Sequence, residues 1–416
     1  MWKKAFKRQT LKIKKYLNGK VLVLTLFSCA ACAVFLGTVS FGFTSATKYL
    51  ASDHSNQVDK EKIPEKKEVK HIKTPEAVKG IYMSSWVAST NDWRTSLTDM
   101  VDSTELNSIV IDVKDYTGKI SFEVSDSELK EIGSGEKRIR DIEDFLKDLH
   151  NRKIYAIARI AVFQDQYLTK KRPDLAVKKK DGVSVWKDRK GISWLDPCSK
   201  EVWDYIVKIG KESERVGFDE LNFDYIRFPS DGDMKNISYN FCPDGFSRAD
   251  MMENFFKYLS RQIKNIGIPI SADMFGFVST NIDDLNIGQV LERASPYFDY
   301  ICPMVYPSHY PPTYNGFKNP AAHPYEVIKL AMDTAVKRLL NQEAGLSPFA
   351  TSTPQFSDSD TKRIGSKIRP WLQDFDMGAT YDAMMVRKQM QAVYDAGLDS
   401  WLLWDPSNKY TREALD

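Results

Sequence analysis

The sequence is poor in the residues that build metal sites and disulfide frameworks, with five cysteines and five histidines among 416 residues. Cys29 and Cys32 belong to an apolar segment near the N-terminus. Cys198, Cys242 and Cys302 are far apart in the rest of the chain and form no CxxC pattern. This spacing indicates neither a metal site nor a disulfide framework, although it leaves open one bridge between Cys198 and Cys242 in an oxidising compartment.

The sequence also lacks the short motifs of several large enzyme classes. It contains no HExxH motif of zinc peptidases, no GxSxG nucleophile turn and no GxxxxGKS/T phosphate-binding loop. His309 and His323 are too isolated to form a metal triad. We therefore expect no metal and no cofactor.

Charge gives no sign of a nucleic-acid partner. The 59 basic and 56 acidic residues leave a net charge of +3, and much of this excess lies in the first 20 residues. With 42% hydrophobic and 12% aromatic residues, the chain has enough apolar material for a large core. We expect a globular protein that does not bind nucleic acid.

The N-terminal residues have the pattern of an export signal. Residues 1–20 form a basic tail, and residues 21–46 are uncharged and apolar. Such a segment is long enough to cross the roughly 30 Å hydrocarbon core as a helix. The positive-inside rule then places the tail in the cytoplasm and the chain after Lys48 outside. We expect a single-pass signal-anchor in the cell membrane. Cleavage after Thr44-Ser45-Ala46, giving a secreted protein, and lipidation at Cys29 are the alternatives.

The remaining chain divides into a spacer and one large domain. Residues 47–77 are rich in Lys, Glu and Pro, which is typical of an unpacked linker. From residue 78 to residue 416, short apolar runs alternate with amphipathic stretches, as in repeated βα units. Eight strands are predicted, at 80–86, 108–114, 154–162, 218–226, 268–276, 298–306, 347–356 and 399–405. This number predicts an α/β fold of the (β/α)₈ TIM-barrel type.

Helical patterns lie between the predicted strands, with apolar residues at three- and four-residue spacing. The clearest are 138–150, 199–216, 249–267 and 325–340. Gly217 and Gly267 stand where helices should end before the fourth and fifth strands. Few residues follow Asp405, so we expect the eighth helix to be short or missing.

Strand alternation sorts the polar residues of a barrel into those that face its axis and those that face the helices. The residues that this sorting turns inward, late in their strands, are Trp86, Asp112, Lys114, Arg159, Asn222, Asp224, Ser271, Asp273, Tyr306 and Trp404. Active sites of TIM barrels lie at the C-terminal mouth. We therefore expect these side chains to line the functional site.

Asp224 and Asp273 end adjacent strands, and neighbouring carboxyls at that position can reach the ~5 to 9 Å spacing of glycosidases. Glycosidic cleavage needs one protonated carboxyl and one carboxylate. We expect Asp224 to be the ionised nucleophile or base, because Arg227 follows closely, and Asp273 to be the acid, because its neighbours are apolar. A buried ion-pair network is the alternative for this pair. For Asp112, with Lys114 nearby, a structural salt bridge and a catalytic role are equally favoured.

Aromatic residues near the strand ends suit a sugar-binding cleft, because ring faces stack on the apolar faces of sugars. Trp86, Tyr306, Trp371 and Trp404 are the candidates, and core packing is the alternative for each. Asp405 follows the last strand and completes the expected substrate-binding set.

At these residues the chain resembles a bacterial family of glycosyl hydrolase domains with an FDYIRFP-type fourth strand. The matching segments span nearly all of residues 79–416 and read GIYMSSW, IDVKDYTG, FDELNFDYIRFPSDG, ADMFG, PMVYPSHY, RPWLQDF and LLWDPSN. The resemblance implies a TIM barrel of the glycoside hydrolase type, and it supports the fold more than the substrate.

Two more distant resemblances bear on the mechanism. FDELNFDYI is similar to the fourth strand of chitinase-type barrels, whose FDGxDxDWE pattern ends in a catalytic glutamate, but Ile226 occupies that position here. Chitinase activity is therefore not expected. The pair Asp224 and Asp273 resembles the strand-four nucleophile and strand-five acid of α-amylase-like barrels.

Three functions remain open. The first is a glycoside hydrolase that cleaves a cell-wall or extracellular polysaccharide, the second a non-catalytic glycan-binding barrel, and the third a different hydrolase or a structural envelope protein. Binding alone becomes the better interpretation if the two carboxyls lie more than about 10 Å apart, or if either is buried with a basic partner.

Overall fold

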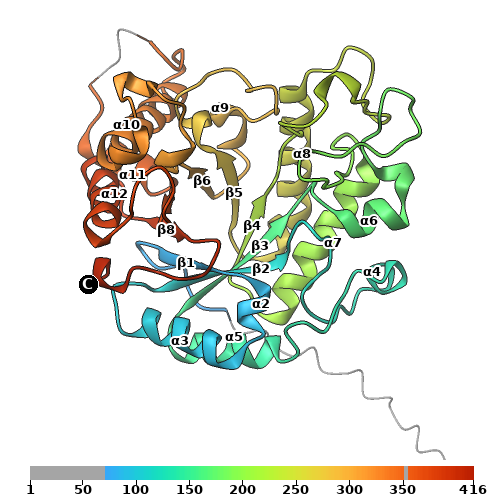
Figure 1. Cartoon of the computed structure of the whole chain (residues 1–416), viewed down its shortest axis with the longest axis horizontal. Coiled ribbons are helices and arrows are strands. Elements are labelled where there is room, and N and C mark those ends of the chain that lie inside the picture. Colours follow the sequence, from blue (N-terminus) through green and yellow to red (C-terminus); the bar gives the residue numbers. More distant parts are fainter. Residues whose placement is uncertain (1–70, 351–354) are drawn as a thin grey trace, which may run out of the picture. The chain divides into compact units, whose positions relative to one another are not determined.

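The computed structural model describes residues 71–350 and 355–416, which form a closed barrel of eight parallel strands in chain order (Figure 1). The last strand pairs with the first and closes the sheet. The strands are β1 (Lys79–Met83), β2 (Ser108–Lys114), β3 (Tyr155–Ala161), β4 (Glu220–Asp224), β5 (Ile270–Phe275), β6 (Tyr300–Met304), β7 (Trp371–Gln373) and β8 (Trp401–Trp404). The predicted (β/α)₈ barrel is confirmed.

The seventh strand was placed wrongly by the sequence. Residues 347–350 and 355–356 of the predicted segment form no strand, and β7 lies further along the chain at Trp371–Gln373. It pairs with β8 through Trp371 with Leu402 and Gln373 with Trp404. A strand of three residues is too short to show alternation, so the longer segment gave the stronger sequence signal.

Helices surround the barrel, as the ribbons in Figure 1 show. The α-helices are α2 (Ser85–Ala88), α3 (Asn91–Asp102), α4 (Ser127–Ile132), α5 (Ile142–Asn151), α6 (Gln166–Lys171), α7 (Lys200–Val216), α8 (Arg248–Ile263), α9 (Leu291–Ala294), α10 (Pro324–Glu343), α11 (Asp358–Gly365) and α12 (Ala383–Asp395). The single-turn helices are η1 (Pro173–Leu175), η2 (Met234–Asn236), η3 (Lys264–Ile266), η4 (Gly276–Ser279), η5 (Pro307–His309), η6 (Tyr314–Gly316), η7 (Pro320–Ala322) and η8 (Arg412–Ala414). After β8 only η8 follows, as expected.

Helix α7 shows how the sequence sets the bounds of an element. The side chain of Ser199 accepts a hydrogen bond from the Val202 amide and caps the N-terminus. Gly217 ends the helix with a φ of 117°, a conformation that residues with a Cβ rarely adopt. Between these ends, Ile206 and Ile209 are buried against the sheet in the outer core.

The barrel interior is filled with side chains below the C-terminal mouth. Tyr155, on β3, donates a hydrogen bond from its hydroxyl to Glu220 Oε2 at 3.0 Å, and Arg369 Nη1 lies 2.7 Å from the same oxygen. All three side chains are buried. An interior closed in this way leaves the mouth as the place for a ligand.

The packed domain begins before the predicted boundary at residue 78. The Ile72 amide donates a hydrogen bond to Asp219 Oδ1 at 2.9 Å, and the hydroxyls of Thr74 and Tyr155 lie 3.0 Å apart. The end of the predicted linker, residues 71–77, therefore contacts the barrel. The predicted tail, the predicted membrane segment 21–46 and the rest of the linker lie outside the described residues. Within residues 71–350 and 355–416, no helix has the length and apolarity needed to cross a bilayer.

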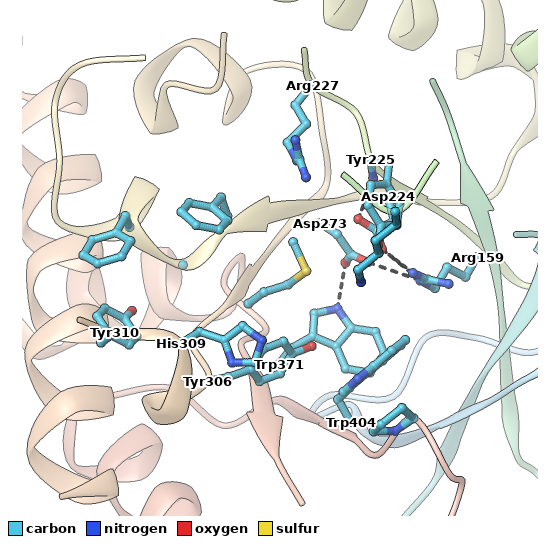
Figure 2. A pocket seen from close by; sticks show the side chains of 16 residues that line it. Arg159, Asp224, Tyr225, Arg227, Asp273, Tyr306, His309, Tyr310, Trp371 and Trp404 are labelled. Atoms are coloured by element: carbon cyan, nitrogen blue, oxygen red, sulfur yellow. Dashed lines mark hydrogen bonds and ion pairs between the residues drawn. The ribbon is translucent and has the colours of Figure 1, made fainter. Parts of the chain in front are cut away.

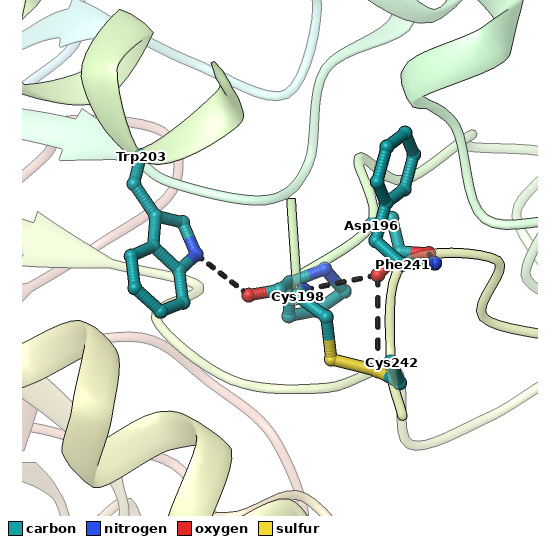
Figure 3. The surroundings of a disulfide bond; sticks show 6 residues. Asp196, Cys198, Trp203, Phe241 and Cys242 are labelled. Carbon is teal, nitrogen blue, oxygen red and sulfur yellow. Dashed lines mark hydrogen bonds between the residues drawn. A yellow bond between two sulfur atoms is a disulfide. The ribbon is translucent and has the colours of Figure 1, made fainter. Parts of the chain in front are cut away.

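Cys198 and Cys242 form a disulfide (Figure 3), the one bridge that the sequence spacing left open. Cys198 lies just before α7, and Cys242 lies in the long loop between β4 and α8, with their Cα atoms 5.1 Å apart. Asp196 supports the junction, because its carboxylate accepts hydrogen bonds from the Cys198 and Phe241 amides. The bridge thus joins the loops that follow β3 and β4.

Removing this bridge should lower stability measurably. It closes a loop with a sequence separation of 44, and loop-closure entropy of that size corresponds to about 3–4 kcal/mol of unfolding free energy. We expect the double variant Cys198→Ser/Cys242→Ser to unfold at lower urea concentration than the oxidised protein. Wild type under reducing conditions should match the double variant. Equal midpoints for the oxidised protein and the variant would contradict this expectation.

Candidate active site

A pocket of about 350 Å³ lies at the C-terminal mouth of the barrel (Figure 2). Seven of the predicted site residues line it, namely Arg159, Asp224, Arg227, Asp273, Tyr306, Trp371 and Trp404. They come from five strands and from the loops after β4 and β6, so residues distant in sequence meet in one place.

Arg159 is the centre of the polar network in the pocket wall. Its Nη1 donates to Asp112 Oδ1 at 2.5 Å, and its Nε donates to Asp224 Oδ2 at 3.1 Å. A second nitrogen, Nη2, also bonds Asp224 Oδ2. Barrel register explains the grouping, because Asp112 is paired with Arg159 across β2 and β3, and Arg159 with Asn222 across β3 and β4.

The two proposed catalytic carboxyls are close together. Arg159 Nε lies 3.1 Å from Asp224 Oδ2 and 3.9 Å from Asp273 Oδ2. These two oxygens can be no farther apart than both distances combined, about 7 Å, which is compatible with glycosidic cleavage. The spacing therefore meets the condition for a hydrolytic pair.

Asp273 lies in surroundings that favour its protonated form. Its burial and the negative charge of Asp224 raise the pKa of Asp273 to about 8, against the opposing effect of Arg159. Oδ1 accepts hydrogen bonds from Asn222 Nδ2 at 2.9 Å and from Trp371 Nε1 at 2.7 Å. Because both partners are donors, a proton on Asp273 belongs on Oδ2.

Asp224 accepts hydrogen bonds through both of its carboxyl oxygens. Oδ2 receives two hydrogen bonds from Arg159, and Oδ1 accepts one from the Tyr225 amide at 2.5 Å. The expected partner, Arg227, makes no ion pair with Asp224 within the described part of the chain; it stacks against Trp194 and Tyr225 instead. Arg159, and not Arg227, is therefore the cation paired with Asp224.

Aromatic side chains form two walls of the pocket. Trp404 stacks on Tyr82 with ring centroids 4.1 Å apart and meets the edge of Trp371 at 5.7 Å. The other wall comes from η4 and the segment after β6, where Phe277 lies 4.7 Å from Tyr310. In Figure 2 this second wall lies beside Tyr306 and His309, away from Asp224 and Arg159.

Lys114 is not in the pocket, contrary to expectation. The register between β2 and β3 shifts between Asp112 and Lys114, so that Lys114 pairs with Ile160 instead of Ala161. An irregularity of one residue moves a side chain to the other face of the sheet. Lys114 is therefore buried, with its Nζ 3.1 Å from Asp165 Oδ2.

Trp86 and Asp405 also lie outside the pocket. The first strand ends at Met83, so Trp86 falls in helix α2, where it is 60% exposed and stacks on Arg138 at 4.2 Å. Asp405 accepts hydrogen bonds from the Ser407 and Lys409 amides and stabilises the turn after β8. Trp86 was predicted to face the pocket because the first strand was assumed to continue past its end at Met83. Asp405 was predicted to bind substrate, but its carboxylate binds the backbone of the turn.

Asp112 and Asn222 do not line the pocket but support it from below. Asp112 accepts a hydrogen bond from Tyr82 at 2.6 Å and pairs with Arg159. Asn222 donates a hydrogen bond from its Nδ2 to Asp273 Oδ1. These two residues were predicted to bind substrate. Their contacts instead position Arg159 and Asp273, which line the pocket.

Several lining residues were missed by the sequence analysis. They are Lys190, Tyr225, Phe275, Gly276, Phe277, Met304, His309, Tyr310 and Pro406. Most belong to irregular segments after the strands, where no periodicity assigns a direction to a side chain. Tyr225 has a φ of 48°, so the chain turns there and the alternation of β4 no longer applies.

A grouping of possible metal ligands occurs in the described residues at Asp196, Cys198 and Cys242. Both sulfurs are joined in the disulfide, so neither is a thiolate able to bind a metal. The chemistry available in the pocket comes from its carboxyls.

Fold and pocket together define a TIM barrel with an acidic pair at its mouth. Residues 80–410 match the family described as "Putative glycosyl hydrolase domain", and the chain belongs to that family. No curated protein sequence matches the chain.

Solved structures with a similar fold include carbohydrate-active enzymes. The PgaB (BpsB) glycoside hydrolase domain from Bordetella bronchiseptica has 11% identity and a TM-score of 0.56, with 82% of this chain and 99% of that chain covered. Alpha-L-fucosidase isoenzyme 2 from Paenibacillus thiaminolyticus has 11% identity and a TM-score of 0.53, covering 81% of this chain and 48% of that one. A hypothetical protein from Ruminiclostridium thermocellum is 34% identical over 46% of this chain and 96% of its own, with a TM-score of 0.42. At these identities the first two likenesses concern the fold alone.

Proposed function

We propose that this protein is a glycoside hydrolase that cleaves a polysaccharide outside the cell with two unequal carboxyls. The observation that carries the proposal is the contrast between Asp224, held by Arg159, and Asp273, whose surroundings favour the proton. Both line one pocket. Membership of a family of glycosyl hydrolase domains supports the same chemistry.

In this mechanism Asp273 Oδ2 gives its proton to the glycosidic oxygen as the bond to the anomeric carbon breaks. Asp224 acts at the opposite side of that carbon by one of two routes. It removes a proton from a water molecule whose oxygen forms the new bond, or it forms a glycosyl ester that a water molecule then hydrolyses while Asp273 takes the proton of that water. Both routes consume one water molecule per bond. The ion pair with Arg159 holds Asp224 in place.

The extracytoplasmic location is part of the proposal and is supported by the sequence. A basic tail precedes the uncharged segment 21–46, which suits a membrane anchor. The disulfide between Cys198 and Cys242 is compatible with an oxidising compartment. We propose a single-pass protein with its barrel outside, or a secreted one if the signal is cleaved.

A second candidate, a glycan-binding barrel without catalysis, is favoured by one observation. Asp224 is buried and paired with Arg159, so one of the two conditions that favour binding alone is met. In that case the aromatic walls would bind a sugar, and neither carboxyl would take part in a reaction. The hydrolase stays the first candidate because both carboxyls line one pocket and the chain belongs to a family of glycosyl hydrolase domains.

A screen of polysaccharides by reducing-end release separates the two candidates. The full-length wild type and its Asp224→Asn variant are incubated with each glycan, and new reducing ends are counted. The hydrolase predicts release by wild type from at least one glycan and none by the variant. Glycans that bind to both proteins without release from either would establish the binding barrel.

The aromatic wall that contains Trp404 gives a separate prediction. Replacing Trp404 by Ala should weaken glycan binding about tenfold, corresponding to ~1.4 kcal/mol, because its ring borders the pocket. Trp86→Ala is the matched control, since that ring is exposed and does not line the pocket. Binding is measured by calorimetry and stability by thermal unfolding. Severe unfolding of Trp404→Ala without a selective binding defect would assign the ring to the core.

A further inference from the structure

The pocket contains positive charge that the described protein residues do not neutralise. Arg159, Lys190 and Arg227 all line it. Arg159 is paired with Asp112 and Asp224. By contrast, no carboxylate oxygen of the described residues lies within 4.0 Å of the terminal nitrogens of Lys190 or Arg227.

Arg227 is held with its hydrogen-bond donors largely unused. Its guanidinium carbon lies 5.2 Å from the Trp194 ring centre and 5.6 Å from that of Tyr225. Nη1 donates to the Phe228 carbonyl at 3.0 Å, which engages one of five N–H groups. Contact with aromatic rings fixes the guanidinium plane and leaves its edge free for a bidentate anion.

The surroundings of Arg227 make its positive charge costly in the absence of a ligand. Burial lowers its pKa, which means that the site disfavours the charged form relative to water. Asp224, Asp231 and Asp188 are the acidic groups near it, and none of these three forms an ion pair with it. The carboxylate of Asp188 is engaged by three other donors, because it accepts hydrogen bonds from the Lys190 and Ile192 amides and from Trp194 Nε1.

The two unpaired cations come from different loops that border the same space. Lys190 lies on the loop after β3, and Arg227 lies just beyond the end of β4. Figure 2 shows Arg227 extending toward the pocket from the side of the view opposite Trp404. The disulfide between Cys198 and Cys242 joins the two loops that carry these cations.

We infer that the pocket binds a glycan that carries a negative charge, a sugar carboxylate or phosphate, with Arg227 as the principal anion-binding residue and Lys190 as the second. The inference rests on the proposed function for its sugar component and names the substrate class of that site. An anionic group on the sugar would accept hydrogen bonds from the free N–H groups of Arg227. The sugar ring that carries this group would lie along an aromatic wall of the pocket. Neutral sugars would leave the same cation unpaired.

Binding of small probes tests this inference without knowledge of the glycosidic linkage. Glucuronic acid, glucose 6-phosphate and glucose are titrated into the full-length protein at equal ionic strength, with tryptophan fluorescence as the readout. We expect at least one anionic probe to bind about tenfold more tightly than glucose. The tighter of the two anions identifies carboxylate or phosphate as the charged group.

Variants of Arg227 assign the preference to its guanidinium. Arg227→Gln should remove most of the preference for the anion, and the double variant Lys190→Gln/Arg227→Gln should abolish it. Arg227→Lys should retain more of it than Arg227→Gln, because the charge remains but the bidentate geometry is lost. Arg189→Gln removes an exposed neighbouring cation that does not line the pocket and should change nothing. Equal binding of all three probes, an anion preference that is undiminished in Arg227→Gln, or one that persists in the double variant, would overturn the inference.

The outcome is distinguishable from a failure of the hydrolase proposal. Hydrolysis of a neutral glycan that depends on Asp224, without any preference for anionic probes, would leave the hydrolase and remove the charged substrate. Anion preference that depends on Arg227, with no hydrolysis of any glycan, would leave the charged ligand and remove the hydrolase.

Discussion

The Asp224→Asn variant is expected to hydrolyse glycan at least about 10³ times more slowly than wild type while binding it with similar affinity. The substitution removes the electron pair that forms or activates the new bond but preserves the size of the side chain. Arg159 keeps its ion pair with Asp112, so the wall of the pocket should persist. Turnover is measured by reducing-end release and affinity by calorimetry.

Asp244→Asn is the matched control, because this aspartate is exposed on the loop between β4 and α8 and does not line the pocket. It should behave as wild type in both assays. An Asp224→Asn protein that remains active, after contamination and deamidation are excluded, would move the chemistry to another carboxyl. Asp112 or Asp405 would then have to act, although neither lines the pocket.

Hydrolysis should fall as the pH rises through about 8, where Asp273 loses its proton. Its pKa is raised from the ordinary range to about 8, first by burial and then by the charge of Asp224. The acid form acts, so activity is present below that pH and lost above it. The measurement is kcat/KM against pH in a buffer series of constant ionic strength.

Asp273→Asn separates this titration from other causes. The variant should lose the alkaline limb and should be severely slowed on natural glycosides, yet retain activity on aryl glycosides whose leaving group needs little protonation. Asp283→Asn, on the loop after β5, serves as control. An alkaline limb that persists unchanged in Asp273→Asn, or equal losses on both substrate types, would contradict the acid role.

The strand pattern allowed most of the barrel to be predicted from the sequence. Periodicity and turn residues identified seven strands, and Gly217 ended α7 as expected because its positive φ favours glycine. β7 was missed because its three residues contain no repeat. The bridge between Cys198 and Cys242 was left open but not predicted, since two cysteines in separate loops give no information about their distance.

Prediction of the pocket succeeded where side-chain alternation holds and failed where it breaks. Arg159, Asp224 and Asp273 lie in or at the end of regular strands and point inward as predicted. Lys114 follows a register shift, so alternation placed it in the pocket wrongly. Tyr225 begins a turn, so alternation did not place it in the pocket that it lines. The positive partner of Asp224 was also misassigned, because Arg227 is near in sequence whereas Arg159 is near across the sheet.

The protonation state of Asp273 can be measured without any substrate and tests the unequal pair most directly. Infrared difference spectra of protein labelled with ¹³C-aspartate are recorded for wild type and Asp273→Asn between acidic and alkaline pH. Asp196 and Asp374, whose pKa values are raised to about 6, contribute to both spectra at lower pH. A protonated-carboxyl band that disappears near pH 8 should be present in wild type and missing from the variant. A wild type whose spectrum matches that of Asp273→Asn at neutral pH would show both carboxyls ionised and would contradict the proposed mechanism.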